Sequence, residues 1–134
     1  MNKAQQARNN AYAPYSRFKV GAALKLSLGK IVIGSNQENA AYPSGLCAER
    51  VAVYSAGANY PDQTITTLAI TVKAESREVK EAIAPCGACR QSLAEYEQKQ
   101  KSPIAIYFMG ETDEIIKVAS VMDLLPLGFD TKYL

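Results

Sequence analysis

The strongest constraint on this chain is the placement of its three cysteines. Two lie three residues apart in the segment Pro85-Cys86-Gly87-Ala88-Cys89-Arg90, and the third, Cys47, precedes Glu49 by two residues. The chain has no histidine, so neither a histidine nor a fourth cysteine can join these three as a metal ligand. An odd number of cysteines suits no disulfide framework, which favours reduced thiols and a cytoplasmic protein.

Length and charge narrow the class of protein. The 134 residues match one ordinary domain with a hydrophobic core, and we expect a single domain over residues 1–134. The 15 basic and 13 acidic residues form no block of like charge, which argues against a nucleic-acid partner. We expect no membrane association, because no stretch approaches the roughly 20 apolar residues of a membrane span and the N-terminus lacks a signal-peptide pattern.

Hydrophobic periodicity predicts a mixed α/β chain. The predicted helices cover residues 2 to about 11, 46–56, 85 to about 99 and 120–125. The predicted strands cover residues 18–28, 31–33, 68–72, 104–109 and 115–118. Residues 74–84 fit either a loop or a single helical turn. Because strands alternate with helices after a first hairpin, we expect a three-layer α/β/α fold, with helices on both faces of a mixed five-stranded sheet.

The predicted helices place all three thiols near helix N-termini, where the macrodipole and free N–H groups stabilise thiolates. A lone Cys-x-x-Cys could equally be a redox pair or two buried thiols. Three cysteines in Cys-Ala-Glu and Pro-Cys-x-x-Cys instead favour zinc, since this is the three-cysteine motif of zinc deaminases. A structural zinc site normally has four protein ligands, whereas a catalytic site leaves one position for water. We therefore predict a catalytic zinc site.

Two charged residues accompany these cysteines. Glu49 lies close enough to Cys47 to move protons to and from a zinc-activated water. Zinc with three thiolates carries a net negative charge, which a neighbouring guanidinium would offset. Arg50 and Arg90 each directly follow motif residues, and we favour Arg50. Taken alone, Glu49 would be a solvated helix residue and Arg50 a surface charge.

Five segments together resemble a known family. They are residues 11–24 (AYAPYSRFKVGAAL), 36–42 (NQENAAY), 47–50 (CAER), 85–91 (PCGACRQ) and 124–129 (LLPLGF). The chain resembles the small homotetrameric cytidine deaminases of nucleoside salvage over nearly its whole length. The two cysteine segments are shared by many deaminases, whereas the first, second and last segments are more specific to the cytidine branch.

The resemblance implies a role for each matching residue. It implies that Cys47, Cys86 and Cys89 hold Zn²⁺, that Glu49 shuttles protons and that Arg50 neutralises thiolate charge. It assigns substrate binding to Asn36 and Glu38 through the ribose hydroxyls, to Ala48 through its backbone, to Phe18 and, from a neighbouring subunit of a homotetramer, to Phe129. By pattern alone, Phe18 fits core packing, and Asn36 and Glu38 fit turn positions.

The implied reaction is hydrolysis of cytidine and deoxycytidine to uridine and deoxyuridine with release of ammonia. Alternative substrates are an aminated nucleoside antibiotic, a free base or a base in nucleic acid. The last needs a basic, aromatic-lined groove that this charge pattern does not suggest. A zinc-stabilised binding module without catalysis is the alternative from another class. The sequence assigns no role to Tyr42 or Tyr54, and residues 73–84 form a longer stretch than the family leads us to expect.

Overall fold

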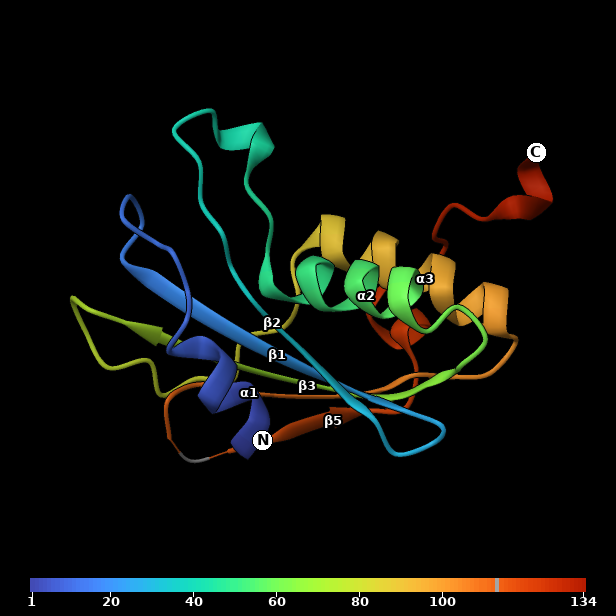
Figure 1. Cartoon of the computed structure of the whole chain (residues 1–134), viewed down its shortest axis with the longest axis horizontal. Helices are drawn as coiled ribbons and strands as arrows, with labels where there is room; N and C mark the ends of the chain where they lie inside the picture. The colour runs from blue at the N-terminus through green and yellow to red at the C-terminus, as the bar shows by residue number, and fades with distance from the viewer. Residues whose placement is uncertain (113) are drawn as a thin grey trace.

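The computed structural model describes residues 1–112 and 114–134 and contains one five-stranded sheet with helices on both faces (Figure 1). The strands are β1 (Phe18–Leu26), β2 (Ile31–Ser35), β3 (Ile65–Ala74), β4 (Ala105–Met109) and β5 (Ile116–Val118). The α-helices are α1 (Asn2–Arg8), α2 (Ala48–Asn59) and α3 (Gly87–Gln100). Three 3₁₀ turns, η1 (Tyr42–Ser44), η2 (Val121–Leu124) and η3 (Thr131–Tyr133), complete the chain.

The sheet is mixed, as the sequence predicts. Its strand order is β2-β1-β3-β4-β5. Strand β1 runs antiparallel to β2 and β3, β3 runs parallel to β4, and β4 runs antiparallel to β5. Helix α3 makes the crossover between the parallel strands β3 and β4, which is the usual connection for a parallel pair.

Two glycines show that α1 and α2 cover opposite faces of the sheet. A Cβ atom at Gly21 would lie 2.0 Å from the Ala4 carbonyl oxygen of α1. A Cβ atom at Gly34 would lie 2.4 Å from the Ala48 carbonyl oxygen of α2. Gly34 pairs with Ala22, the neighbour of Gly21, and successive strand residues point to opposite faces. The predicted three-layer α/β/α arrangement is therefore confirmed.

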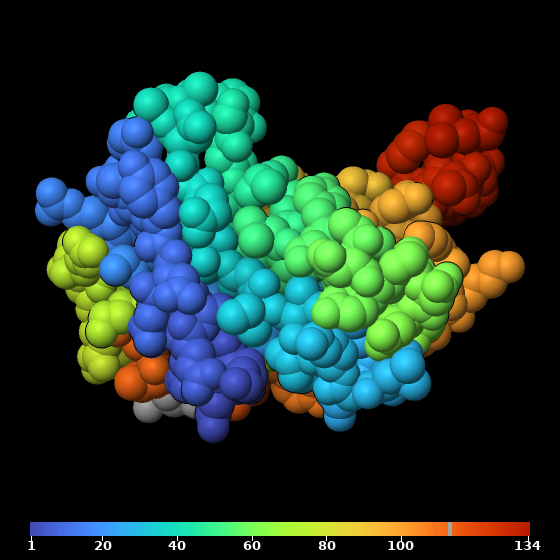
Figure 2. Space-filling model, in the orientation of Figure 1, coloured from blue at the N-terminus to red at the C-terminus, as the bar shows by residue number. Residues whose placement is uncertain are grey.

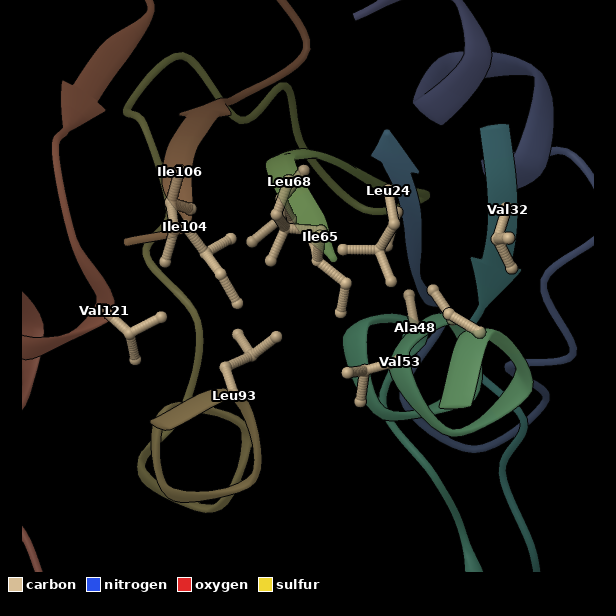
Figure 3. Packing of buried hydrophobic residues seen from close by; sticks show 14 of the residues in the cluster. Leu24, Val32, Ala48, Val53, Ile65, Leu68, Leu93, Ile104, Ile106 and Val121 are labelled. Atoms are coloured by element: carbon tan, nitrogen blue, oxygen red, sulfur yellow. The ribbon is translucent and has the colours of Figure 1, made fainter. Parts of the chain in front are cut away.

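The hydrophobic core lies between the sheet and the helix pair α2–α3 (Figure 3). Leu24, Leu68 and Ile106 extend from three neighbouring strands, and all three are fully buried. Val53 of α2 and Leu93 of α3 meet them from the helical side and are also fully buried. This packing fixes the N-termini of α2 and α3 relative to each other.

Several predicted boundaries were wrong at the ends of elements. Helix α1 ends at Arg8 rather than near residue 11, because Tyr12 pairs with Gln37 and draws the chain into an extended conformation. Helix α2 begins at Ala48 and continues through Gly57 to Asn59. Gly57 lies inside the helix, where its missing side chain leaves room for the Tyr96 ring.

The later elements differ from the prediction in similar ways. Strand β3 is twice as long as predicted, because β1 pairs with it along its whole length. Pro85 precedes α3 instead of starting it, since Cys86 has extended backbone and forms the N-cap. Residues 74–84 form no helix, and the predicted last helix is the 3₁₀ turn η2. Ser120 is its N-cap, in a capping box with Asp123.

Candidate metal centre and active site

The three cysteines, remote in sequence, converge where α2 and α3 begin. Cys47 is the N-cap of α2, Cys86 is the N-cap of α3, and Cys89 lies in the first turn of α3. The Sγ atoms of Cys47 and Cys86 are 3.8 Å apart, and all three sulfur atoms lie within 4.8 Å of one another. Tetrahedral zinc with Zn–S bonds of about 2.3 Å places its sulfur ligands about 3.8 Å apart. The sulfur cluster therefore fits a zinc ion.

The three thiols also influence one another's pKa values. A hydrogen bond from the Cys89 thiol lowers the pKa of Cys47 to about 5; burial opposes this shift, and hydrogen bonds from Arg50 and Cys86 support it. The same hydrogen bond, together with burial, raises the pKa of Cys89. These opposite shifts favour the thiolate at Cys47, and a metal ion held by all three sulfur atoms would displace the proton that Cys89 retains.

Glu49 is buried beside the thiols in the first turn of α2, with 4% of its surface exposed. Burial raises the pKa of its carboxyl group, and the negative charge of Cys47 raises it further. Hydrogen bonds to the Glu49 backbone and to Cys89 act in the opposite direction without cancelling the shift. A carboxyl group with a raised pKa next to a metal centre is suited to accept and release protons near neutral pH.

The two candidate arginines have different partners. Arg50 Nη2 donates to Cys47 Sγ over 3.9 Å, so its charge lies against a thiol of the cluster. Arg90 Nε donates to the Pro85 carbonyl over 2.7 Å, and Arg90 Nη1 donates to the Leu124 carbonyl over 3.0 Å. The guanidinium of Arg90 thus ties α3 to the chain on either side, whereas that of Arg50 is in the position expected of the neutralising charge.

A cavity of about 480 Å³ opens next to Cys47. Its lining includes Asn36 and Glu38 from the segment after β2, and Arg50 from α2. The cavity has the size of an ordinary small-molecule site. The structure therefore brings both predicted ribose ligands to the same cavity as one predicted zinc ligand and Arg50, the predicted neutralising charge.

Asn36 and Glu38 are held by hydrogen bonds from the chain around β1. Val20 N donates to Asn36 Oδ1 over 2.8 Å, and Asn36 Nδ2 donates to the Phe18 carbonyl over 2.8 Å. Glu38 Oε2 accepts from Tyr15 N over 2.9 Å and from Ser16 N over 3.2 Å. Both side chains therefore have fixed orientations at the cavity wall.

The remaining predicted site residues do not line this cavity. Ala48 is fully buried at the start of α2, and Phe18 is half-buried at the start of β1. Phe129 is 56% exposed and its carbonyl accepts from Gln91 Nε2 over 3.0 Å. The C-terminal segment and the loop around η1 project from the same side of the molecule but stand well apart (Figures 1 and 2). Within one chain, Phe129 does not reach the cavity.

The cavity contains residues that the sequence interpretation left without a role. Tyr15 and Ser16 line it, and so does Tyr42, whose ring centroid lies 6.0 Å from that of Tyr15. Tyr15 and Ser16 belong to the first of the five segments that resemble the family, and this membership could have indicated a role in the site. Tyr54 lies elsewhere and shares a hydrogen bond of 3.0 Å with Ser92 of α3.

Comparison with known proteins gives a consistent result. Residues 1–104 match the family described as the cytidine and deoxycytidylate deaminase zinc-binding region. The cytidine deaminase of Halalkalibacterium halodurans is 40% identical over 129 residues, which cover 96% of this chain and 90% of the relative. That of Sporosarcina psychrophila is 37% identical over 127 residues, covering 95% of this chain and 86% of the relative. The crystal structure of the cytidine deaminase from Burkholderia pseudomallei is similar with a TM-score of 0.82 and 39% identity, covering 96% of this chain and 94% of that chain.

Proposed function

The chain belongs to the cytidine and deoxycytidylate deaminase family, and from this premise we propose that it hydrolyses cytidine and deoxycytidine to uridine and deoxyuridine, releasing ammonia. The observation that carries the proposal is the convergence of three thiols and the buried Glu49 beside a cavity lined by polar side chains. Zinc is the cofactor, since the family binds zinc and the sulfur cluster fits that ion.

Cys47, Cys86 and Cys89 would hold the zinc ion. Bound there, zinc would act as a Lewis acid that makes water a nucleophile near neutral pH. Glu49 takes a proton from that water and gives it to N3 of the pyrimidine ring, which activates C4 for attack. Once the hydroxide has added to C4, Glu49 takes the proton of the new C4 hydroxyl and gives it to the amino group, which departs as ammonia while the C4 carbonyl forms. Burial suits Glu49 to both transfers, because a raised pKa lets one carboxyl group act as base and acid.

Sugar recognition falls to Asn36 and Glu38 in this proposal. An ionised carboxylate only accepts hydrogen bonds, whereas an amide both accepts and donates. Together they match sugar hydroxyls, which donate and accept, and they favour a nucleoside over a free base. The same subunit also contacts the substrate through Phe18 and through the buried start of α2, where the backbone of Ala48 faces the pyrimidine edge.

Phe129 acts in a neighbouring subunit, and the assembly is a homotetramer with shared active sites. The exposed apolar side chains of the C-terminal segment support this proposal, since Leu127, Phe129 and Leu134 are solvent-accessible in the single chain. Size-exclusion chromatography tests the assembly, and a monomer would contradict it. Co-expression of Glu49→Gln with Phe129→Ala subunits tests sharing: mixed tetramers should regain activity that each variant alone lacks, and no regain would contradict a shared site.

Residues 1–134 act as one catalytic domain of pyrimidine salvage in the cytoplasm. The continuous sheet and its single core cluster support the one-domain proposal. Across the described residues, no helix has both the length and the apolar character needed to cross a membrane.

The decisive experiment follows absorbance while purified protein is incubated with cytidine, deoxycytidine, cytosine or adenosine. We expect turnover of the first two only. Turnover of cytosine or adenosine alone would show that the proposed substrate is wrong. No turnover of any of the four by the zinc-loaded protein would favour a binding module without catalysis. The variant Glu49→Gln should retain zinc and lose at least about 100-fold in kcat, because it cannot transfer protons. Full activity in this variant would contradict the mechanism.

A further inference from the structure

Residues 14–17 form a turn whose polar groups converge on one carboxylate. Tyr15 N and Ser16 N donate to Glu38 Oε2, over 2.9 Å and 3.2 Å, and Ser16 Oγ donates to Glu38 Oε1. The Ser16 hydroxyl also accepts from Phe18 N over 3.1 Å, so its own orientation is fixed. Ser16 is the one residue that contacts both oxygen atoms of Glu38 in this turn.

The backbone of this turn is strained in a way that serves the contact. Arg17 has a φ of 54°, in the left-handed region that residues with a side chain seldom occupy. Arg17 N donates to the Ala13 carbonyl over 3.1 Å, and Glu75 N donates to the Arg17 carbonyl over 3.0 Å, which holds the turn closed. Strained backbone of this kind persists where the surroundings enforce it, most often at binding sites.

The turn leaves the Glu38 carboxylate able to accept one further hydrogen bond. Burial alone would raise the pKa of its carboxyl group, but the hydrogen bonds from Ser16 and Tyr15 outweigh it and lower the pKa. An ionised carboxylate has about four acceptor positions, and the turn fills three of them. The free position is on Oε1, the oxygen held by the Ser16 hydroxyl, and Ser16 and Glu38 both line the cavity.

We propose that Ser16 is a positioning residue for sugar recognition, which fixes Glu38 Oε1 so that its free acceptor position receives the 2′- or 3′-hydroxyl of a nucleoside. This inference rests on the proposed function, because it takes the cavity to be the nucleoside site. Ser16 itself need not touch the substrate. Its effect passes through Glu38 and depends on the presence of sugar hydroxyls.

A purely structural role for Ser16 makes a different prediction. If the Ser16 hydroxyl only stabilised the turn, its removal would lower activity equally for nucleosides with and without the 2′- and 3′-hydroxyls of the sugar. A positioning role instead lowers activity selectively for the hydroxylated nucleoside. The ratio of kcat/KM for cytidine to kcat/KM for 2′,3′-dideoxycytidine separates the two, because general damage to the fold cancels in this ratio.

The experiment measures this ratio for the zinc-loaded wild-type protein and for Ser16→Ala, Glu38→Gln, their double variant and the control Ser76→Ala. Ser76 is exposed and lies outside the cavity lining. We expect Ser16→Ala to reduce the ratio about tenfold, mainly through a higher KM for cytidine, as for the loss of one hydrogen bond to a charged group. The control should leave the ratio unchanged. In the Glu38→Gln background, Ser16→Ala should have no further effect on the ratio.

Each other outcome is decisive. If the wild type turns over cytidine, two results would overturn the positioning role. One is a kcat/KM ratio in Ser16→Ala that equals that of the wild type. The other is a change in this ratio on Ser16→Ala that is the same with Glu38 as with Gln at that position. Absence of cytidine turnover in the wild type would instead overturn the proposed function. Zinc content and far-ultraviolet circular dichroism of each variant confirm that the compared proteins are folded and loaded.

Discussion

Substituting Gly34 by alanine should damage the metal centre without touching a ligand. Gly34 lies in β2 beneath the first turn of α2, the turn that carries Glu49 and follows Cys47. A Cβ atom there would lie 2.4 Å from the Ala48 carbonyl oxygen and 2.7 Å from Ala52 N. Both atoms belong to the backbone of α2, so no side-chain rotation can relieve the clash.

The size of the effect follows from these distances. Ordinary van der Waals contact begins near 3.4 Å, so the start of α2 must retreat from the sheet by about 1 Å in a densely packed interior. Overpacking of a core costs about 1–3 kcal/mol, and we expect the upper end because only backbone can move. The same retreat would shift Cys47 relative to Cys86, whose sulfur atoms now lie 3.8 Å apart. Because metal sites tolerate distance errors of only about 0.2 Å, zinc binding should weaken by roughly 10- to 100-fold.

Two assays measure the two effects separately. Denaturant unfolding of the metal-free protein gives the loss of stability, and competition with a chromophoric chelator gives the zinc affinity. Gly87→Ala is the matched control, because it makes the same change beside Cys86 where a Cβ atom meets nothing within 4 Å. This control should keep its zinc affinity and gain up to about 1 kcal/mol, since alanine favours a helix over glycine. Equal zinc affinity and stability in Gly34→Ala and Gly87→Ala would refute the reasoning.

Three further substitutions test other parts of the structure. Cys86→Ser should abolish stoichiometric zinc by elemental analysis, because the chain has no fourth cysteine to replace it; retained zinc would contradict its role as a ligand. Glu97→Ala should lower the free energy of unfolding by about 3 kcal/mol, because it leaves Ile104 N and Val121 N without their buried acceptor; a loss below 1 kcal/mol in denaturant titration would contradict this. Lys101→Gly should raise the free energy of unfolding by about 1 kcal/mol, because Lys101 ends α3 with a φ of 53°; an unchanged melting temperature would count against it.

The sequence predicted those features that depend on local pattern. The period-two alternation after Phe18 identified β1, and the apolar run from Ile104 identified β4. The cysteine spacing predicted a cluster of three thiols, which the structure contains.

Features that depend on contacts remote in sequence could not be predicted in this way. Glu97 has the pattern of a solvated helix residue, yet its carboxylate accepts from Ile104 N and Val121 N and is buried. Ser16 has the pattern of an ordinary turn residue, and its bond to Glu38 exists because Tyr12 pairs with Gln37. Val121 lies 24 residues from Glu97 and Glu38 lies 22 residues from Ser16, so each of these pairs forms only when the folded chain brings the two segments together.

The same distinction separates the two arginines that could balance the charge of the proposed metal centre. Three thiolates around Zn²⁺ carry a net charge of −1. A single guanidinium in contact with them therefore offsets most of this negative charge. Sequence position made Arg50 and Arg90 equivalent, because each directly follows a motif residue. Folding separates them: two carbonyl groups occupy Arg90, whereas Arg50 contacts Cys47 and its buried Nε has no hydrogen-bond partner among the described residues. Arg50 therefore retains donor capacity for the cluster, and Arg90 cannot replace it without releasing the start of α3 from Pro85 and Leu124.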